Sequence, residues 1–125
     1  MSARVLSVMI KNFLSTKKQH QQSSHGGSGA VALYEIWDKA DFQSDIDFID
    51  RVVVPPGSNI GFHQHGNNEE MYVILQGTGL MKLEDEEVTV EQGDMILNPR
   101  GGSHGLTNNS DGDLDILVIQ VSIRD

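Results

Sequence analysis

The sequence predicts an all-β protein built as a single antiparallel sandwich or closed barrel, with an N-terminal arm in front of it. Two observations predict this class. Short runs rich in β-branched and aromatic residues recur between turn signals after residue 30, and no segment sustains the 3.6-residue period of a helix. The chain has 125 residues, enough for one domain that buries a core without disulfides.

Residues 1–29 are expected to form an N-terminal arm with a Gly/Ser-rich loop, and residues 30–125 the barrel domain. The first 29 residues hold four basic residues and no acid, whereas all 18 acids and five bases follow, so the charges are +4 and −13. A basic, acid-free terminus resembles an organelle transit peptide, but an arm that packs on a second subunit or extends into solvent is preferred. The polar, glycine-rich segment Gln19–Gly29 is interpreted as a loop or linker.

About eight or nine short strands are expected in the barrel domain. Pro55 and Pro56 end one of them, because proline cannot donate to a strand ladder. Gly77 and Gly79 permit a tight connection, since glycine adopts positive φ readily. Asp38–Asp45 could form a turn of helix. The clearest strand runs are Ala30–Trp37, Asp47–Val54, Met71–Gln76, Leu80–Leu83, Val88–Val90, Met95–Leu97 and Leu114–Ser122.

Composition excludes several classes of function. The chain has no cysteine, which rules out thiolate metal sites, iron–sulfur clusters and cysteine nucleophiles. A net charge of −9 disfavours nucleic acid as a partner. The apolar run Val5–Leu14 is interrupted by Lys11 and Asn12 and is far shorter than the roughly 20 residues of a membrane span. We therefore expect no nucleic-acid or membrane partner and a cytoplasmic location.

Three histidines and one glutamate form a candidate metal site. His63 and His65 are two residues apart, so on a strand both imidazoles point to one face. Glu70 stands at the head of the next strand, and His104 lies in a separate hairpin that would have to close over the same cavity. Each residue taken alone is more often an ordinary surface side chain. Together they form a nitrogen and oxygen ligand set that suits Mn, Fe(II), Co, Ni, Cu or Zn better than Mg or Ca.

The spacing of these residues resembles the two sequence motifs of the cupin superfamily. One segment is Gly57-x5-His63-x-His65-x4-Glu70-x6-Gly77, the other is Gly93-x5-Pro99-x-Gly101-x2-His104-x3-Asn108, and 15 residues separate them. The resemblance spans about residues 48–122. It implies a jelly-roll (double-stranded β-helix) barrel of six to eight antiparallel strands that holds a divalent transition metal (Mn, Fe, Ni, Co or Zn). The implied ligands are His63, His65, Glu70 and His104, whereas the motif glycines and Pro99 shape turns and Asn108 is structural.

The resemblance leaves the reaction open, because similar cupins include dioxygenases, decarboxylases, isomerases, lyases and binding modules. Small cupins of this kind are described as oxalate-decarboxylase-like or sugar-isomerase-like. We expect the metal site to bind or transform a small oxygenated molecule, a carboxylate or a sugar-like compound. The alternative is a non-catalytic metal- or ligand-binding or sensing module. Similar small cupins are usually dimers, so a homodimer is expected, with Val5–Leu14 as the exchanged segment.

Two residues are candidates for a catalytic role beside the metal. Tyr72 is two residues from Glu70, so its phenol should share the cavity face and could donate a proton or a hydrogen bond. Arg51 would anchor an anion if Ile49 and Val53 also point inward, although a surface Arg51 paired with Asp47 or Asp50 is the slightly preferred interpretation. Weaker candidates are Lys82, Gln120 and His25.

Overall fold

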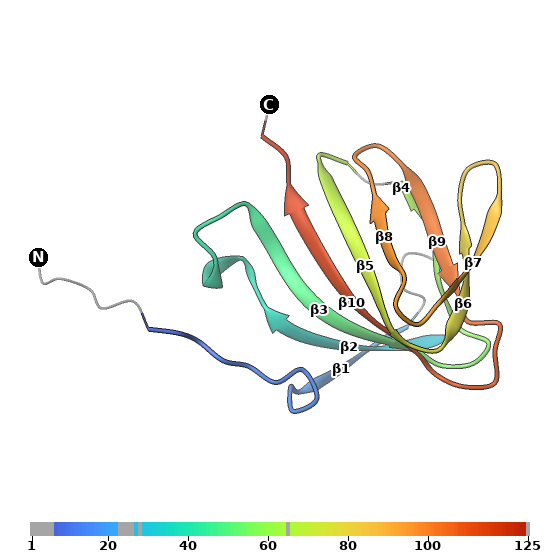
Figure 1. The fold of residues 1–125 in the computed structure, drawn as a ribbon, viewed down its shortest axis with the longest axis horizontal. Coiled ribbons are helices and arrows are strands. Elements are labelled where there is room, and N and C mark those ends of the chain that lie inside the picture. Colours follow the sequence, from blue (N-terminus) through green and yellow to red (C-terminus); the bar gives the residue numbers. More distant parts are fainter. Residues whose placement is uncertain (1–6, 23–26, 28, 65, 125) are drawn as a thin grey trace, which may run out of the picture.

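The computed structural model describes residues 7–22, 27, 29–64 and 66–124. In these residues ten strands form two antiparallel sheets that face each other, and the helical structure is limited to the 3₁₀ turn η2 (Lys39–Asp41) (Figure 1). The predicted all-β jelly-roll fold is thus confirmed. The strands, in chain order, are β1 (Lys18–Gln22), β2 (Ala30–Trp37), β3 (Ile46–Val54), β4 (Asn59–Gln64), β5 (Asn68–Gln76), β6 (Thr78–Lys82), β7 (Glu87–Glu91), β8 (Met95–Asn98), β9 (Ser103–Thr107) and β10 (Leu114–Ser122).

The two sheets mix strands that are distant in sequence. The six-stranded sheet has the order β1-β2-β3-β10-β5-β8, and the four-stranded sheet has the order β4-β9-β6-β7. β10, the last strand, therefore lies between β3 and β5 in the middle of the larger sheet, which Figure 1 shows as the red strand between two green ones. This topology brings residues of both cupin-like motifs to the space between the sheets.

The core fills that space because alternate residues of each strand point inward. On β10, Leu114 and Ile116 are fully buried, and on the neighbouring β5 Tyr72 and Ile74 are buried in the same way. Burial of such apolar side chains stabilises the fold by roughly 1.5 to 3 kcal/mol each. The same alternation that places Tyr72 and Ile74 in the core also turns Glu70 inward.

Two motif residues have clear structural roles at turns. Gly77, between β5 and β6, has φ +93°, and a Cβ there would lie 2.4 Å from the carbonyl oxygen of Asp113. Asn108 is completely buried, and its amide donates to the carbonyl oxygens of Val54 and Gly112 at 2.7 Å. Asn108 therefore ties the end of β3 to the loop between β9 and β10, in agreement with the structural role implied by the resemblance.

The structure differs from the sequence prediction in residues 19–22, which belong to β1. This segment was expected to be part of a loop or linker, yet β1 pairs with β2 and extends the larger sheet by one strand. Polar residues can form an edge strand because only backbone groups are needed for pairing. The helical turn expected within Asp38–Asp45 is confirmed as η2, which begins with a capping box formed by Asp38 and Asp41. The domain boundary after residue 29 stays a prediction.

In front of β1, the arm contacts the barrel through Lys11 and Phe13. Lys11 donates to the carbonyl oxygen of Ile36 and lies 4.5 Å from the centre of the Trp37 ring, while Phe13 lies near the Arg51 guanidinium. Residues 7–10 project away from the barrel (Figure 1). Within the described residues, none of the helical structure has the length and apolar character that crossing a membrane requires.

Candidate metal centre

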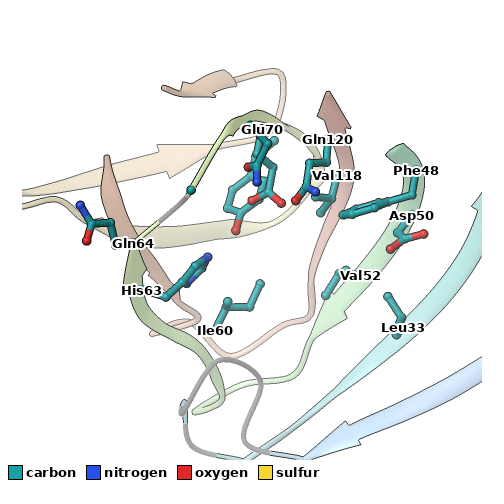
Figure 2. A pocket seen from close by; sticks show the side chains of 13 residues that line it. Leu33, Phe48, Asp50, Val52, Ile60, His63, Gln64, Glu70, Val118 and Gln120 are labelled. Atoms are coloured by element: carbon teal, nitrogen blue, oxygen red, sulfur yellow. The ribbon is translucent and has the colours of Figure 1, made fainter. Parts of the chain in front are cut away.

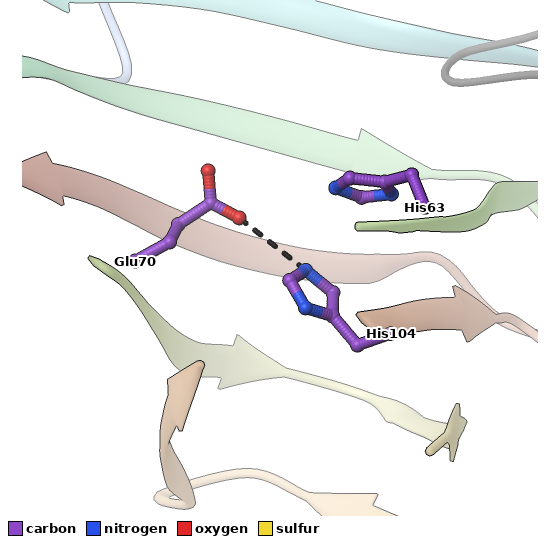
Figure 3. Close-up of side chains that lie close together, drawn as sticks. All are labelled: His63, Glu70 and His104. Carbon is purple, nitrogen blue, oxygen red and sulfur yellow. Dashed lines mark ion pairs between the residues drawn. The ribbon is translucent and has the colours of Figure 1, made fainter. Parts of the chain in front are cut away.

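Three of the predicted ligands meet between the two sheets. His63 on β4 and His104 on β9 are paired across the four-stranded sheet, and Glu70 comes from β5 of the six-stranded sheet. Their potential ligand atoms all lie within 4.8 Å of one another, and Figure 3 shows the three side chains converging. Residues 41 positions apart in the chain are thus joined by the fold into one cluster.

A local irregularity of β4 sets the position of His63. The register between β4 and β9 shifts between Ile60 and His63, which is the signature of a β-bulge or similar distortion. Gly105 of β9 lies opposite, where a Cβ would approach the Phe62 nitrogen to 3.0 Å and the Ile60 oxygen to 3.1 Å. The absence of a side chain at Gly105 therefore allows the distorted β4 to approach β9 and to place His63 beside His104.

The donor atoms fit a divalent transition metal. His63 Nδ1 lies 2.8 Å from the carbonyl oxygen of Gly61, so it is the protonated nitrogen and the buried Nε2 carries the lone pair. His104 Nε2 lies 3.5 Å from Glu70 Oε1 (Figure 3, dashed line). Ligand atoms bound at about 2.1 Å to one ion are at most about 4.2 Å apart, so small side-chain rotations bring all three into range.

Tyr72 lies directly beside these residues, as the sequence predicts for a residue two positions from Glu70. Its hydroxyl is 3.3 Å from His104 Nε2, and the two rings meet edge to face. Burial raises the pKa of Tyr72 well above its ordinary value, and the charge of Glu70 and a hydrogen bond with it raise it further. The phenol is therefore a hydrogen-bond donor at neutral pH.

A cavity of about 460 Å³ opens from this cluster, a size typical of small-molecule sites. Figure 2 shows its polar end around His63, Glu70 and Gln120 and its apolar wall on β2 and β3. The apolar lining residues are Leu33, Phe48, Val52, Ile60 and Val118, and the polar ones are Asp50, His63, Gln64, Asn68, Glu70, Tyr72 and Gln120.

Asp50 is a cavity residue that the sequence analysis missed. It stands on β3 between Phe48 and Val52, which share its face. Burial raises the pKa of Asp50 to about 7, and the negative charges of Glu35 and Glu70 contribute. The sequence places Asp50 on the same strand face as apolar Phe48 and Val52. The other face carries Ile49 and Val53, which are also apolar, so the alternation did not reveal which face points inward.

The structure corrects the expected orientation of Arg51. It does not line the cavity, because the face of β3 that carries Asp50 and Val52 is the inward one. Arg51 lies on the outer face of the sheet, where its guanidinium binds both carboxylate oxygens of Asp115 on β10 at 2.9 and 2.8 Å. Arg51 is therefore an aspartate-paired surface residue, as the preferred interpretation expected, but its partner is Asp115 and the expected partners Asp47 and Asp50 are wrong.

The remaining candidates have different positions. Gln120 lines the cavity and donates to Asp47 at 3.1 Å. Lys82 lies outside it, 5.5 Å from the centre of the Phe62 ring. His65, the fourth predicted ligand, and His25 lie outside the described residues, so their roles stay predictions.

Comparisons with known proteins agree with this fold. An oxalate-binding protein from Thermotoga maritima is 31% identical over 94 residues, which cover 75% of this chain and 78% of that protein. A solved structure described as a predicted oxalate decarboxylase, also from Thermotoga maritima, superposes with a TM-score of 0.89 at 26% identity, over 92% of this chain and 100% of the other.

A more distant relative is a mannose-1-phosphate guanylyltransferase from Klebsiella pneumoniae, 26% identical over 113 residues. The match covers 89% of this chain but only 24% of that enzyme, so it concerns one part of a larger protein. The family model described as Cupin domain matches residues 50–120, more than half of the sequence. The matched residues include His63, Glu70 and His104. The chain therefore belongs to the cupin family.

Proposed function

We propose that this cupin binds a divalent transition metal (Mn, Fe, Ni, Co or Zn) and uses it to hold a small oxygenated molecule in the cavity. One observation carries the proposal: His63, Glu70 and His104 converge from both sheets at the polar end of a cavity that also has an apolar wall. Carboxylate and imidazole ligands of this kind suit such ions. His65 is proposed as the fourth ligand, on the cupin motif.

The residues around the cluster have distinct proposed roles. A bound divalent ion would supply a Lewis acid for an oxygen atom of the ligand. Tyr72 would donate a hydrogen bond to that ligand from its position beside His104, 3.3 Å from Nε2. Phe48 and Val118 would exclude water from one side of the ligand, since both line the apolar wall.

A binding module without turnover is the second candidate. The relative that is 31% identical is described by what it binds, oxalate, and not by a reaction. Its name supports an oxygen-rich small molecule as the ligand of this chain. A comparison of ligand binding with product formation on the metal-loaded protein separates the two candidates, because only an enzyme forms product.

The metal proposal is tested with Glu70→Gln and His104→Ala, with Glu69→Gln as the matched control. Glu69 is the neighbour of Glu70 on β5 and points to the other face of the sheet. We expect the parent and Glu69→Gln to bind about one ion per chain, whereas each cluster variant binds it at least about tenfold more weakly.

Metal content by elemental analysis and Mn²⁺ titration by calorimetry measure this difference. The ion should also raise the melting temperature of the parent and of Glu69→Gln, because a ligand of the folded state stabilises it by mass action. Equal occupancy in Glu70→Gln and the parent contradicts the proposal.

We also propose that the chain forms a homodimer through its arm. Val8 and Ile10 are each 88% exposed, and Met9 and Leu14 are also largely exposed. Apolar side chains gathered on one projecting segment favour a protein partner. A second copy of this chain fits, because Met95 and Leu97 on the edge strand β8 offer an exposed apolar surface of their own.

A further inference from the structure

Among the described residues, the cavity is lined by acidic side chains and by no lysine or arginine. The acidic lining residues are Asp50 and Glu70. The nearby cations are engaged elsewhere. Arg51 is paired with Asp115 on the outer face, and Lys39, in a neighbouring groove that Asp50 also lines, is paired with Asp47 at 3.2 Å.

Of the two carboxylates that line the cavity, Asp50 is the one that can bind a ligand directly. It lies on the wall across the cavity from His63 (Figure 2). Within the described part of the chain its carboxylate has no hydrogen bond or ion pair, unlike Asp47, which accepts from Gln120 and Ser122. Glu70 is already assigned to the metal cluster. A carboxylate in a partly buried cavity is stabilised by hydrogen-bond donors, so a ligand with hydroxyl groups complements Asp50.

The charge balance disfavours a doubly charged ligand. A divalent ion with Glu70 leaves a net charge of +1, and ionised Asp50 reduces it to zero. A dicarboxylate would then add two negative charges near a carboxylate whose pKa of about 7 already reflects burial and the charges of Glu35 and Glu70. Like charges at short range are unfavourable where water is scarce, whereas a neutral or singly charged ligand avoids most of this cost.

The size and the lining of the cavity point the same way. Its volume of about 460 Å³ equals roughly fifteen water molecules, far more than a two-carbon diacid fills. Apolar side chains such as Phe48 and Val52 line one wall, and Asn68 and Gln120 add two amide side chains to the lining. A polyhydroxylated carbon chain matches both surfaces, with C–H groups on the wall and hydroxyl groups toward the amides.

We propose that Asp50 determines ligand specificity in this cupin: it accepts a hydrogen bond from a hydroxyl group of a polyhydroxy compound, neutral or with one carboxylate, and it repels dicarboxylate dianions. The inference rests on the proposed metal-dependent ligand binding and names the class of ligand. It separates this chain from its relative described as oxalate-binding.

The test uses the full chain loaded with Mn²⁺ at pH 8, titrated by calorimetry with D-gluconate and with oxalate. The parent is expected to bind gluconate at least about tenfold more tightly than oxalate, and Asp50→Asn to reduce that ratio by about tenfold. Asp113→Asn is the matched control, because Asp113 is exposed and outside the cavity; it should keep the ratio of the parent. The metal content of the protein after each titration shows whether oxalate has removed the ion. If it has, the measured heat is not scored as binding of oxalate to the protein.

Each other result has a distinct meaning. A parent that prefers oxalate, a ratio unchanged in Asp50→Asn, or binding of neither ligand to the Mn²⁺-loaded protein overturns the assignment of Asp50. Loss of Mn²⁺ from Asp50→Asn also overturns it, since Asp50 would then act on the ion itself. Failure of the parent to bind Mn²⁺ refutes the proposed function, and the specificity inference with it.

Discussion

Asp50 illustrates how a single side chain can combine a functional position with a cost in stability. Its carboxyl group lies in the cavity near Glu70 and Glu35, and burial is the largest cause of its raised pKa. An isolated aspartate has a pKa near 3.8, whereas Asp50 has one of about 7. Buried titratable side chains that lower the stability of the folded protein are often found in binding or active sites, where their chemistry is needed.

The pKa of Asp50 predicts a pH-dependent stability of the metal-free protein. Between pH 4 and pH 7 the folded chain holds a proton on Asp50 that the unfolded chain has released, so this group makes the free energy of unfolding fall as the pH rises. Asp50→Asn cannot lose a proton. Its stability relative to the parent should therefore increase from pH 4 to pH 7 and level off near pH 8.

Denaturant unfolding of chelator-treated parent and Asp50→Asn at a series of pH values measures this difference. The comparison between the two proteins cancels the titration of the other acids. A constant difference across the range would show that Asp50 titrates normally in the folded chain.

At the scale of the strands, the metal site depends on an irregular strand pairing and on a tight turn as well as on regular strands. The irregular pairing of β4 with β9 places His63 beside His104, and the turn at Gly77 begins β6, the other neighbour of β9. Gly77 has both a positive φ and a carbonyl oxygen in the space of a Cβ. Gly93 has φ +93° with open space around it, and Gly112 has open space without a positive φ.

These three glycines predict a graded effect of alanine substitution. Gly77→Ala should destabilise the protein by about 2 to 4 kcal/mol, because it adds backbone strain and a clash with the Asp113 carbonyl. Gly93→Ala should cost about 1 kcal/mol for strain alone, and Gly112→Ala should remain within about 0.5 kcal/mol of the parent. Free energies of unfolding in urea give the order, and equal values for Gly77→Ala and Gly112→Ala would disprove it.

At the scale of the whole molecule, the described residues of the arm before Lys11 do not pack on the barrel. The arm is attached near Lys11 and Phe13, and its apolar residues before Lys11 point away from the sheets. We expect the full chain to elute as a dimer and a variant without residues 1–17, which keeps β1, to elute as a folded monomer.

Size-exclusion chromatography with light scattering measures the mass, and circular dichroism verifies that the shortened chain is folded. The double variant Val8→Ser, Ile10→Ser is the milder test, since it changes only two exposed side chains of the arm. It should shift the equilibrium toward monomer. The same dimer for all three proteins, or a monomeric parent, would refute the role of the arm.

The sequence by itself determined the fold class and most of the cluster. Alternating runs such as Leu114–Ser122 specify strands, and the spacing of His63, Glu70 and His104 relative to the motif glycines indicates the metal site. These features are local, since a period of two and a turn glycine are visible without knowledge of the partner strand.

The tertiary structure alone decided which face of β3 is the inner one and that residues 18–22 form a strand. Both faces of β3 carry apolar residues, so its alternation does not reveal whether Arg51 or Asp50 points inward. Arg51 faces outward where Asp115, 64 residues later, supplies its partner, and β1 forms because β2 offers a free edge. Such pairings depend on residues distant in the chain, and only the packed sheets bring them together.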